Sequence, residues 1–170
     1  MRVALLAGGF GGARFAQALA ETVGEENLTV VGNVGDDVEV LGLHVSPDLD
    51  SVLYTLAGVF DSERGWGRKD ETWNALETAA ELGDEQWFTL GDRDVGLHLI
   101  RSKALRRGES LSAITRRLTA AFGIATTVLP ASDDRIRTWV DTPLTAFRDG
   151  LNKTILRLFM AIVTTDILLG

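Results

Sequence analysis

The chain has 170 residues and a net charge of -7, and 45% of its residues are hydrophobic and 24% charged. Such a chain forms one globular domain with its own core, and its acidic balance argues against nonspecific nucleic-acid binding, which requires a basic surface. It holds no cysteine, which excludes disulfides and thiolate metal sites and suits a reducing compartment.

The N-terminal apolar run, residues 2–7, predicts a buried strand. It is too short for a signal peptide, and the chain has no uncharged apolar stretch of the roughly 18 residues that a membrane-spanning helix needs. We therefore expect a cytoplasmic protein whose partners are neither a membrane nor a nucleic acid.

A glycine-rich run comes directly after this strand: Gly8, Gly9, Phe10, Gly11 and Gly12. Residues 12–22 follow with a helical pattern. Glycine lets the backbone turn tightly and approach a ligand, and the free N–H groups at a helix N-terminus attract phosphate. The combination predicts a site for a phosphate-containing ligand near residues 8–14. A tight turn that binds nothing is the alternative.

Two common phosphate-binding patterns do not fit this run. The dinucleotide fingerprint, counted from Gly9, needs a sixth-position glycine where the chain has Arg14. A P-loop ends in Gly-Lys-Ser/Thr, which is missing here. An ordinary NAD enzyme or P-loop nucleotide hydrolase is therefore disfavoured.

Residues 28–32 predict a second buried strand. The N-terminal part of the chain therefore indicates a strand–helix–strand unit of an α/β sheet. Polar residues follow it directly: Asn33, Asp36 and Asp37. A helix is expected from Ser46, which can cap it, and Pro47, which suits its first position. Asp48 and Asp50 then lie in its first turn, where negative charge is favoured by the helix dipole.

The rest of the chain continues the alternation of helices and strands. The sequence predicts a loop over 58–70, helices over 71–82, 95–107 and 111–122, and strands over 86–90, 124–129 and 135–142. Ser110 is expected to cap the last of these helices, and Gly123 to follow its end. Trp66, between two glycines, is a candidate for stacking on a flat ring, with loop packing as the alternative.

Four polar or glycine-rich loops follow the predicted strands: 8–12, 33–37, 91–94 and 131–134. Ligands of open α/β sheets bind beyond the carboxyl ends of the strands, so we expect these loops to converge. Their carboxylates can hold Mg²⁺ or act as a base. The alternatives are helix-terminal charge for Asp48 and Asp50, a polar turn for Asp133 and Asp134, and a local ion pair for Arg93.

The two histidines, His44 and His98, are too few and too far apart to indicate a zinc site. We expect His98 to lie at the surface or at an interface.

Taken in order, these segments resemble one family, the 2-phospho-L-lactate transferases of coenzyme F-420 (deazaflavin) biosynthesis. The matching segments are Gly8–Ala13, Asn33–Asp37, His44–Asp50, Tyr54–Leu56, Gly65–Gly67, Leu90–Asp94, His98–Arg101 and Leu129–Asp134. They run in the family's order over residues 1–147. The resemblance implies a Rossmann-like, open and mostly parallel sheet with a helical insertion, from which the C-terminal part of the family fold is missing.

The resemblance also implies a reaction. A 2-phospho-L-lactate or phosphoenolpyruvate moiety passes from its guanosine-diphosphate-activated donor to the deazaflavin Fo, and GMP leaves. Mg²⁺ is the implied cofactor, and a homodimer is implied for the full-length fold. Such a transfer depends on positioning and charge neutralisation more than on covalent chemistry.

Roles for particular residues follow from the same resemblance. Asp48 and Asp50 are expected to be catalytic and to hold the metal. The expected substrate-binding residues are Gly8, Gly9, Phe10, Gly11, Gly12, Asn33, Asp36, Asp37, Trp66, Thr89, Gly91, Asp92, Arg93, Asp94, Asp133 and Asp134.

Beyond residue 147 the chain matches nothing in the family pattern, and residues 148–170 form an apolar tail expected from a frameshift or a truncation. An α/β sheet cut in half exposes a strand edge and an apolar face, so we expect weak stability and no independent activity. Two alternatives stay open. One is a nucleotide-sugar-binding regulator of the gluconeogenesis-factor type, which shares the glycine loop and the Asp-Asp loop. The other is an inactive remnant.

Overall fold

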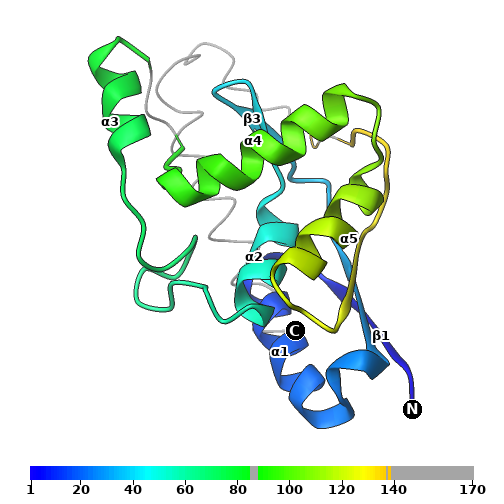
Figure 1. The fold of residues 1–170 in the computed structure, drawn as a ribbon. Helices are drawn as coiled ribbons and strands as arrows, with labels where there is room; N and C mark the ends of the chain where they lie inside the picture. The colour runs from blue at the N-terminus through cyan, green and yellow to red at the C-terminus, as the bar shows by residue number, and fades with distance from the viewer. Residues whose placement is uncertain (85–87, 137, 139–170) are drawn as a thin grey trace, which may run out of the picture. The chain divides into compact units, whose positions relative to one another are not determined.

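A computed structural model describes residues 1–84, 88–136 and 138 (Figure 1). The chain divides into two compact units, Met1–Arg137 and Thr138–Gly170, and all the elements named below lie in the first unit. In the described part of the chain, no helix has the length and hydropathy of a membrane span.

The main sheet consists of three parallel strands in the order β1-β2-β5: β1 (Val3–Ala7), β2 (Leu28–Gly32) and β5 (Thr127–Pro130). Helix α1 (Gly9–Val23) connects β1 to β2, with a short 3-10 turn, η1 (Glu25–Asn27), before β2. The register pairs Val30 with Leu5 on one side and with Val128 on the other. The structure therefore confirms the predicted open α/β fold with a parallel sheet.

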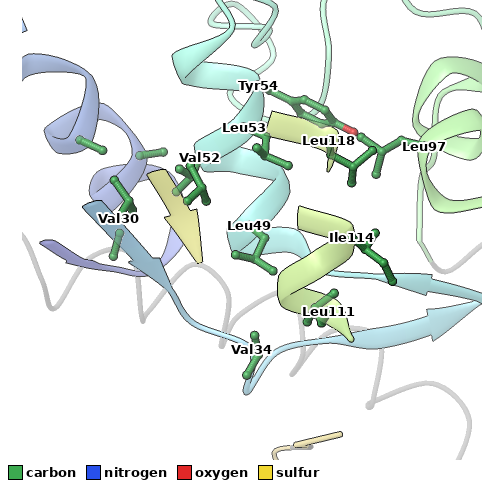
Figure 2. Packing of buried hydrophobic residues seen from close by; sticks show 14 of the residues in the cluster. Val30, Val34, Leu49, Val52, Leu53, Tyr54, Leu97, Leu111, Ile114 and Leu118 are labelled. Atoms are coloured by element: carbon green, nitrogen blue, oxygen red, sulfur yellow. The ribbon is translucent and has the colours of Figure 1, made fainter. Parts of the chain in front are cut away.

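One face of this sheet carries the core. Helices α1, α2 (Pro47–Leu56) and α5 (Leu111–Ala121) share a single hydrophobic cluster with it, part of which is drawn in Figure 2. Val30 and Leu49 at its centre are fully buried. The close fit depends on Gly32, because a Cβ there would lie 2.6 Å from Leu49 Cδ2. Helix α2 is thereby held against the strand that precedes the Asn33 loop.

A short hairpin that was not predicted lies between β2 and α2. Its strands are β3 (Val38–Val40) and β4 (Leu43–Val45), which pair antiparallel. The two residues between them, Leu41 and Gly42, both have positive φ, of 52° and 69°, as a two-residue hairpin turn requires. Leucine disfavours that conformation, so the turn carried no sequence signal.

Two predicted strands lie partly outside the described residues, and their described parts are not strand. Residues 88–90 of the predicted strand 86–90 have no strand pairing, and Leu90 instead packs against Val40 and Val45 of the hairpin. In the predicted strand 135–142, residues 135, 136 and 138 are not strand, and the other residues lie outside the described part. For residues 88–90 the strand prediction was wrong, because a short apolar run also fits a loop that covers a hairpin.

The predicted helices agree with the structure better than the predicted strands do. Helices α3 (Asn74–Glu81), α4 (Asp92–Arg106) and α5 lie where they were predicted, although α3 begins three residues late and α4 three residues early. Ser110 caps α5 by accepting a hydrogen bond from Ala113 N–H, and Gly123 follows it with φ 70°, both as predicted. The tail, residues 148–170, lies outside the described residues.

Candidate functional site

Three segments meet at the carboxyl ends of β1 and β2, and the Asp48 carboxylate joins them. The N–H of Gly9 donates to Asp48 Oδ1 at 2.7 Å, and Asn33 Nδ2 donates to Asp48 Oδ2 at 2.7 Å. The glycine run, the loop after β2 and the first turn of α2 are thus held on one carboxylate. Of the four loops predicted to converge, 8–12 and 33–37 meet here, together with the first turn of α2.

The glycine run belongs to the first turn of α1 and not to a loop before it, so the expected helix start at residue 12 was too late. Gly8 precedes the helix in an extended conformation, and Gly12 N–H already donates to Gly8 O at 3.3 Å. The N–H groups of Phe10 and Gly11 fall in the first turn, where a helix offers them no acceptor of its own. N–H groups in this position can bind an anion.

Glycine is required at Gly12 for packing. A Cβ there would lie 3.1 Å from Ala7 Cβ and 3.2 Å from Ala7 Cα, so the helix would have to move away from β1. Phe10 points to the loop over 58–70 and stacks on Phe60, with ring centroids 4.6 Å apart. Phe10 therefore fixes that loop against the glycine run.

Acidic side chains crowd around Asn33. Its Nδ2 also donates to Asp36 Oδ2 at 3.2 Å. Burial raises the pKa of Asp48; the hydrogen bonds from Asn33 and Gly9 oppose this, and the charges of Asp36 and Asp37 add to it. Among residues 1–84, 88–136 and 138, no three His, Asp or Glu side chains are arranged to hold a metal ion by themselves.

Asp37 is tied to the hairpin. Its Oδ2 accepts hydrogen bonds from Ser46 Oγ at 2.9 Å and lies 2.8 Å from His44 Nε2. Its Oδ1 is buried and has no hydrogen-bond partner among the described residues. The expectation that the Ser46 side chain caps α2 was wrong, because Ser46 Oγ accepts no hydrogen bond from the helix backbone and its hydroxyl donates to Asp37. His44 and Ser46 were missed as site residues because the hairpin that brings them to Asp37 was not predicted.

Asp50 faces the other side of α2. Two positions along a helix amount to a rotation of about 200°, so Asp48 and Asp50 have separate partners. Both carboxylate oxygens of Asp50 accept from the guanidinium of Arg101, with the NH1 donor at 3.0 Å from Oδ2, and the pair is buried.

His98 lies one helical turn before Arg101 and completes this buried group. Its Nδ1 is 3.3 Å from Arg101 NH1. It is 2% exposed, so the expected surface position was wrong, and burial lowers its pKa to about 4. His98 is therefore neutral near pH 7 and able to accept from the arginine. The sequence signal for this group was the family-like segment His98–Arg101.

The free N–H groups at the start of α4 are already bonded to a side chain of the protein. Glu71 accepts hydrogen bonds from the N–H groups of Arg93, at 2.9 Å, and Asp94, at 3.2 Å. A Cβ on Gly91 would lie 2.3 Å from Glu71 Cδ, so the glycine makes room for that carboxylate. Burial raises the pKa of Asp94 to about 6, and the charges of Asp50 and Glu71 add to the shift, against the Tyr54 hydroxyl and Arg68.

Other predicted site residues are not joined to the Asp48 group. Asp92 accepts from Thr72, Asn74 and Ala75 at the start of α3, and these hydrogen bonds lower its pKa to about 2. Asp133 accepts from the Ser112 N–H at 2.6 Å and its Oγ at 2.9 Å at the start of α5. Helix N-termini leave N–H groups that need acceptors, which both aspartates supply.

The remaining candidates are exposed. Thr89, Arg93 and Asp134 are exposed side chains, and Trp66 is 41% exposed. The Trp66 ring lies 6.0 Å from that of Trp73, and the Arg64 guanidinium lies over both rings. Their substrate-binding roles stay predictions.

Comparison with known proteins shows what the chain resembles. The family model described as 2-phospho-L-lactate transferase CofD matches residues 3–150. A phosphoenolpyruvate transferase of Kitasatospora aureofaciens is 49% identical over 142 residues, which cover 82% of this chain and 44% of that protein. One of Streptomyces griseus is 48% identical over 156 residues, which cover 91% of this chain and 48% of that protein. The chain thus spans about half the length of these curated relatives.

Proposed function

Because the chain belongs to the 2-phospho-L-lactate transferase CofD family, we propose that it supplies the phosphate-binding part of a transferase of coenzyme F-420 biosynthesis. The observation that carries this proposal is the junction of Gly9, Asn33 and Asp48 at the carboxyl ends of two parallel strands. Ligands of open α/β sheets bind there, and glycine-rich helix N-termini bind phosphate.

We propose that the donor is a guanosine-diphosphate-activated phospho-acid and that its diphosphate contacts the N–H groups of Phe10 and Gly11. The named relatives are phosphoenolpyruvate transferases, which favours an enolpyruvyl group over a lactyl group. The Asp48 carboxylate keeps Gly9 and Asn33 in place and so fixes the direction of the neighbouring N–H groups. Fixed donors need no reorganisation when charge develops on the transferred group.

Magnesium suits these residues as an ion shared between protein and ligand. The carboxylates of Asp36 and Asp48 both approach Asn33 Nδ2, and they come from different elements. Mg²⁺ in phosphate-transfer sites is held by one or two carboxylates together with substrate phosphates and water. In the described part of the chain, no three acidic or histidine side chains are grouped to hold a metal ion by themselves, which agrees with an ion held jointly by protein and ligand. When bound, the ion neutralises phosphate charge.

Asp50 is proposed to hold α2, and with it Asp48, in place through its buried pair with Arg101, while the hydroxyl of the deazaflavin Fo attacks and GMP leaves. Arg101 fixes its orientation through two hydrogen bonds. Metal ligation by Asp50 would require this pair to open, so the structure favours Asp48 as the metal ligand.

Two binding measurements test this function. Calorimetric titration with guanosine diphosphate and Mg²⁺ is expected to show saturable binding that Asp48→Asn weakens at least tenfold. Titration of Fo, followed by its fluorescence, is expected to show quenching that Asp50→Asn weakens. Glu81→Gln, an exposed change on α3, is the matched control and leaves both unchanged. A folded chain that binds neither ligand would overturn the proposal.

A further inference from the structure

A groove with apolar walls lies between helices α4 and α5, both labelled in Figure 1. It has a volume of about 380 Å³, which is within the range of small-molecule sites. Both helices contribute apolar lining, and two arginines add charge to it. The residues used below are Leu97, Ile100, Leu118, Phe122, Arg68 and Arg93. This hollow is called the α4–α5 groove.

The two arginines bring positive charge that the protein does not pair. Among the described residues, no carboxylate lies within ion-pair distance of either guanidinium group. The Arg68 guanidinium is held over two rings, 5.6 Å from the centroid of Tyr54 and 5.5 Å from that of Phe122. Its Nε is buried and has no hydrogen-bond partner. Buried polar atoms are normally bonded, so Arg68 lacks a partner that a ligand can supply.

The acidic side chains near the groove form no hydrogen bond with these arginine side chains. Burial raises the pKa of Asp94 and the charge of Arg68 opposes that rise, but no hydrogen bond joins the two. Glu71 accepts from the backbone N–H groups of Arg93 and Asp94 instead. Residues 92–122 contain seven Lys or Arg and three Asp or Glu, in a chain of net charge -7. This region therefore attracts anions although the whole chain is acidic.

Gly96 keeps the groove open. It lies in the interior of α4, where glycine lowers helix stability relative to alanine. A Cβ at this position would meet nothing within 4 Å, so the packing of the protein does not require the glycine. Gly96 lines the groove, and any side chain there would extend into its space. The absence of a side chain at Gly96 thus favours occupation of the groove by something else.

We propose that the α4–α5 groove binds a small monocarboxylate with an apolar body. The carboxylate would pair with Arg68 and Arg93, because a planar guanidinium matches the two oxygens of a carboxylate. The apolar body would cover Leu97, Ile100 and Leu118. A phosphate ligand suits the groove less well, because the N–H groups at the start of α4 are already bonded to Glu71.

This groove is separate from the proposed phosphate site. Phe122 follows the last residue of α5, and a short connection leads from it to the amino end of β5. Gly9 and Asn33 follow the carboxyl ends of β1 and β2, and the three strands are parallel. The two sites therefore lie toward opposite ends of the sheet, and the groove proposal does not depend on the proposed function.

Calorimetric titration of the 170-residue chain with octanoate, without nucleotide, tests the proposal. We expect saturable binding, and at least tenfold weaker binding of acetate, which lacks the apolar body, and of octanol, which lacks the charge. Gly96→Leu fills the groove while favouring the helix, and should weaken octanoate binding at least tenfold. Arg93→Gln, at an exposed position, should weaken it at least fivefold. Arg116→Gln is the matched control, an exposed α5 residue outside the groove lining.

Amide chemical shifts provide a second readout that needs no substitution. Octanoate should change those of Gly96, Leu97 and Phe122 and leave those of Phe10 and Gly11 unchanged. Four outcomes would overturn the proposal: no saturable binding to the folded chain, equal binding of octanol, full binding by folded Gly96→Leu, or equal weakening by Arg116→Gln. A homodimer that Gly96→Leu abolishes would overturn it as well, because the groove would then belong to a second copy.

Discussion

The N–H of Gly9 donates a 2.7 Å hydrogen bond to the carboxylate of Asp48, 39 residues further along the chain. This bond connects the first turn of α1 to the first turn of α2 at the carboxyl ends of the strands. It places a buried carboxylate beside the N–H groups proposed to bind phosphate. The stability of the fold and the binding of a ligand therefore make opposite demands on Asp48.

Asp48→Asn is expected to change the free energy of unfolding by no more than about 1 kcal/mol at neutral pH, because the removal of a buried charge offsets the loss of one of two hydrogen bonds. Burial and the charges of Asp36 and Asp37 raise the pKa of Asp48, so its ionised form is disfavoured in the folded state. Asparagine removes that charge and keeps one oxygen acceptor. Urea unfolding measures the change, and a loss above about 2 kcal/mol would show that the ionised carboxylate stabilises the fold.

Removing the Arg101 side chain is expected to lower the free energy of unfolding strongly. Arg101→Met leaves the Asp50 carboxylate buried without its counter-charge, which costs about 3 to 5 kcal/mol. Arg117→Met is the matched control, because its pair with Glu109 is exposed and is worth at most about 1 kcal/mol. Urea unfolding compares the two. The double variant Asp50→Asn/Arg101→Met is expected to recover part of the loss, and no recovery would contradict this explanation.

Stability is expected to fall as the pH rises through the pKa of Asp94. Burial raises that pKa from 3.8 to about 6, so the folded state favours the protonated form. The contribution of Asp94 is fully present below about pH 4 and is lost as the pH rises through about 6, a change of about 1 to 3 kcal/mol. Asp94→Asn should remove this component from a series of urea melts at pH 4 to 7. An unchanged pH profile in the variant would refute the assignment.

Two glycines of the same helix provide a contrast. Gly12→Ala places a Cβ 3.1 Å from Ala7 Cβ, which should cost about 1 to 3 kcal/mol by overpacking. Gly11→Ala meets nothing within 4 Å and should stabilise α1 by up to about 1 kcal/mol. Thermal melts followed by circular dichroism compare the pair. Equal effects of the two substitutions would contradict the close contact between α1 and β1.

The parts of the fold that were predictable are those with a strong local signal. Residues 28–32 are apolar or β-branched and end in glycine, and they form β2 at those bounds. Ser110 caps the start of α5 and Gly123 follows its end with a positive φ, as predicted. The hairpin was missed because its turn places Leu41 at positive φ, which leucine seldom adopts. Residues 88–90 looked like part of a strand because packing against a hairpin and packing in a sheet both require apolar side chains.

The candidate site was predictable where strand ends define it, as at Gly9 and Asn33. Acidic loops alone did not identify a site, because Asp92 and Asp133 serve helix N-termini instead. That use depends on which helix start lies within reach, which no local pattern reveals. Arg101 was part of a recognised segment, yet its pairing with Asp50, 51 residues earlier, depends on how α4 packs beside α2.

Amide chemical shifts of the isotope-labelled chain, recorded during titration with guanosine diphosphate and Mg²⁺, test the phosphate site most directly. The largest changes are predicted at Phe10 and Gly11, with smaller ones at Gly9 and Asn33. The N–H groups of Arg93 and Asp94, already bonded to Glu71, should stay unchanged. Saturable changes centred on Arg93 and Asp94, with none in the glycine run, would contradict the proposed site.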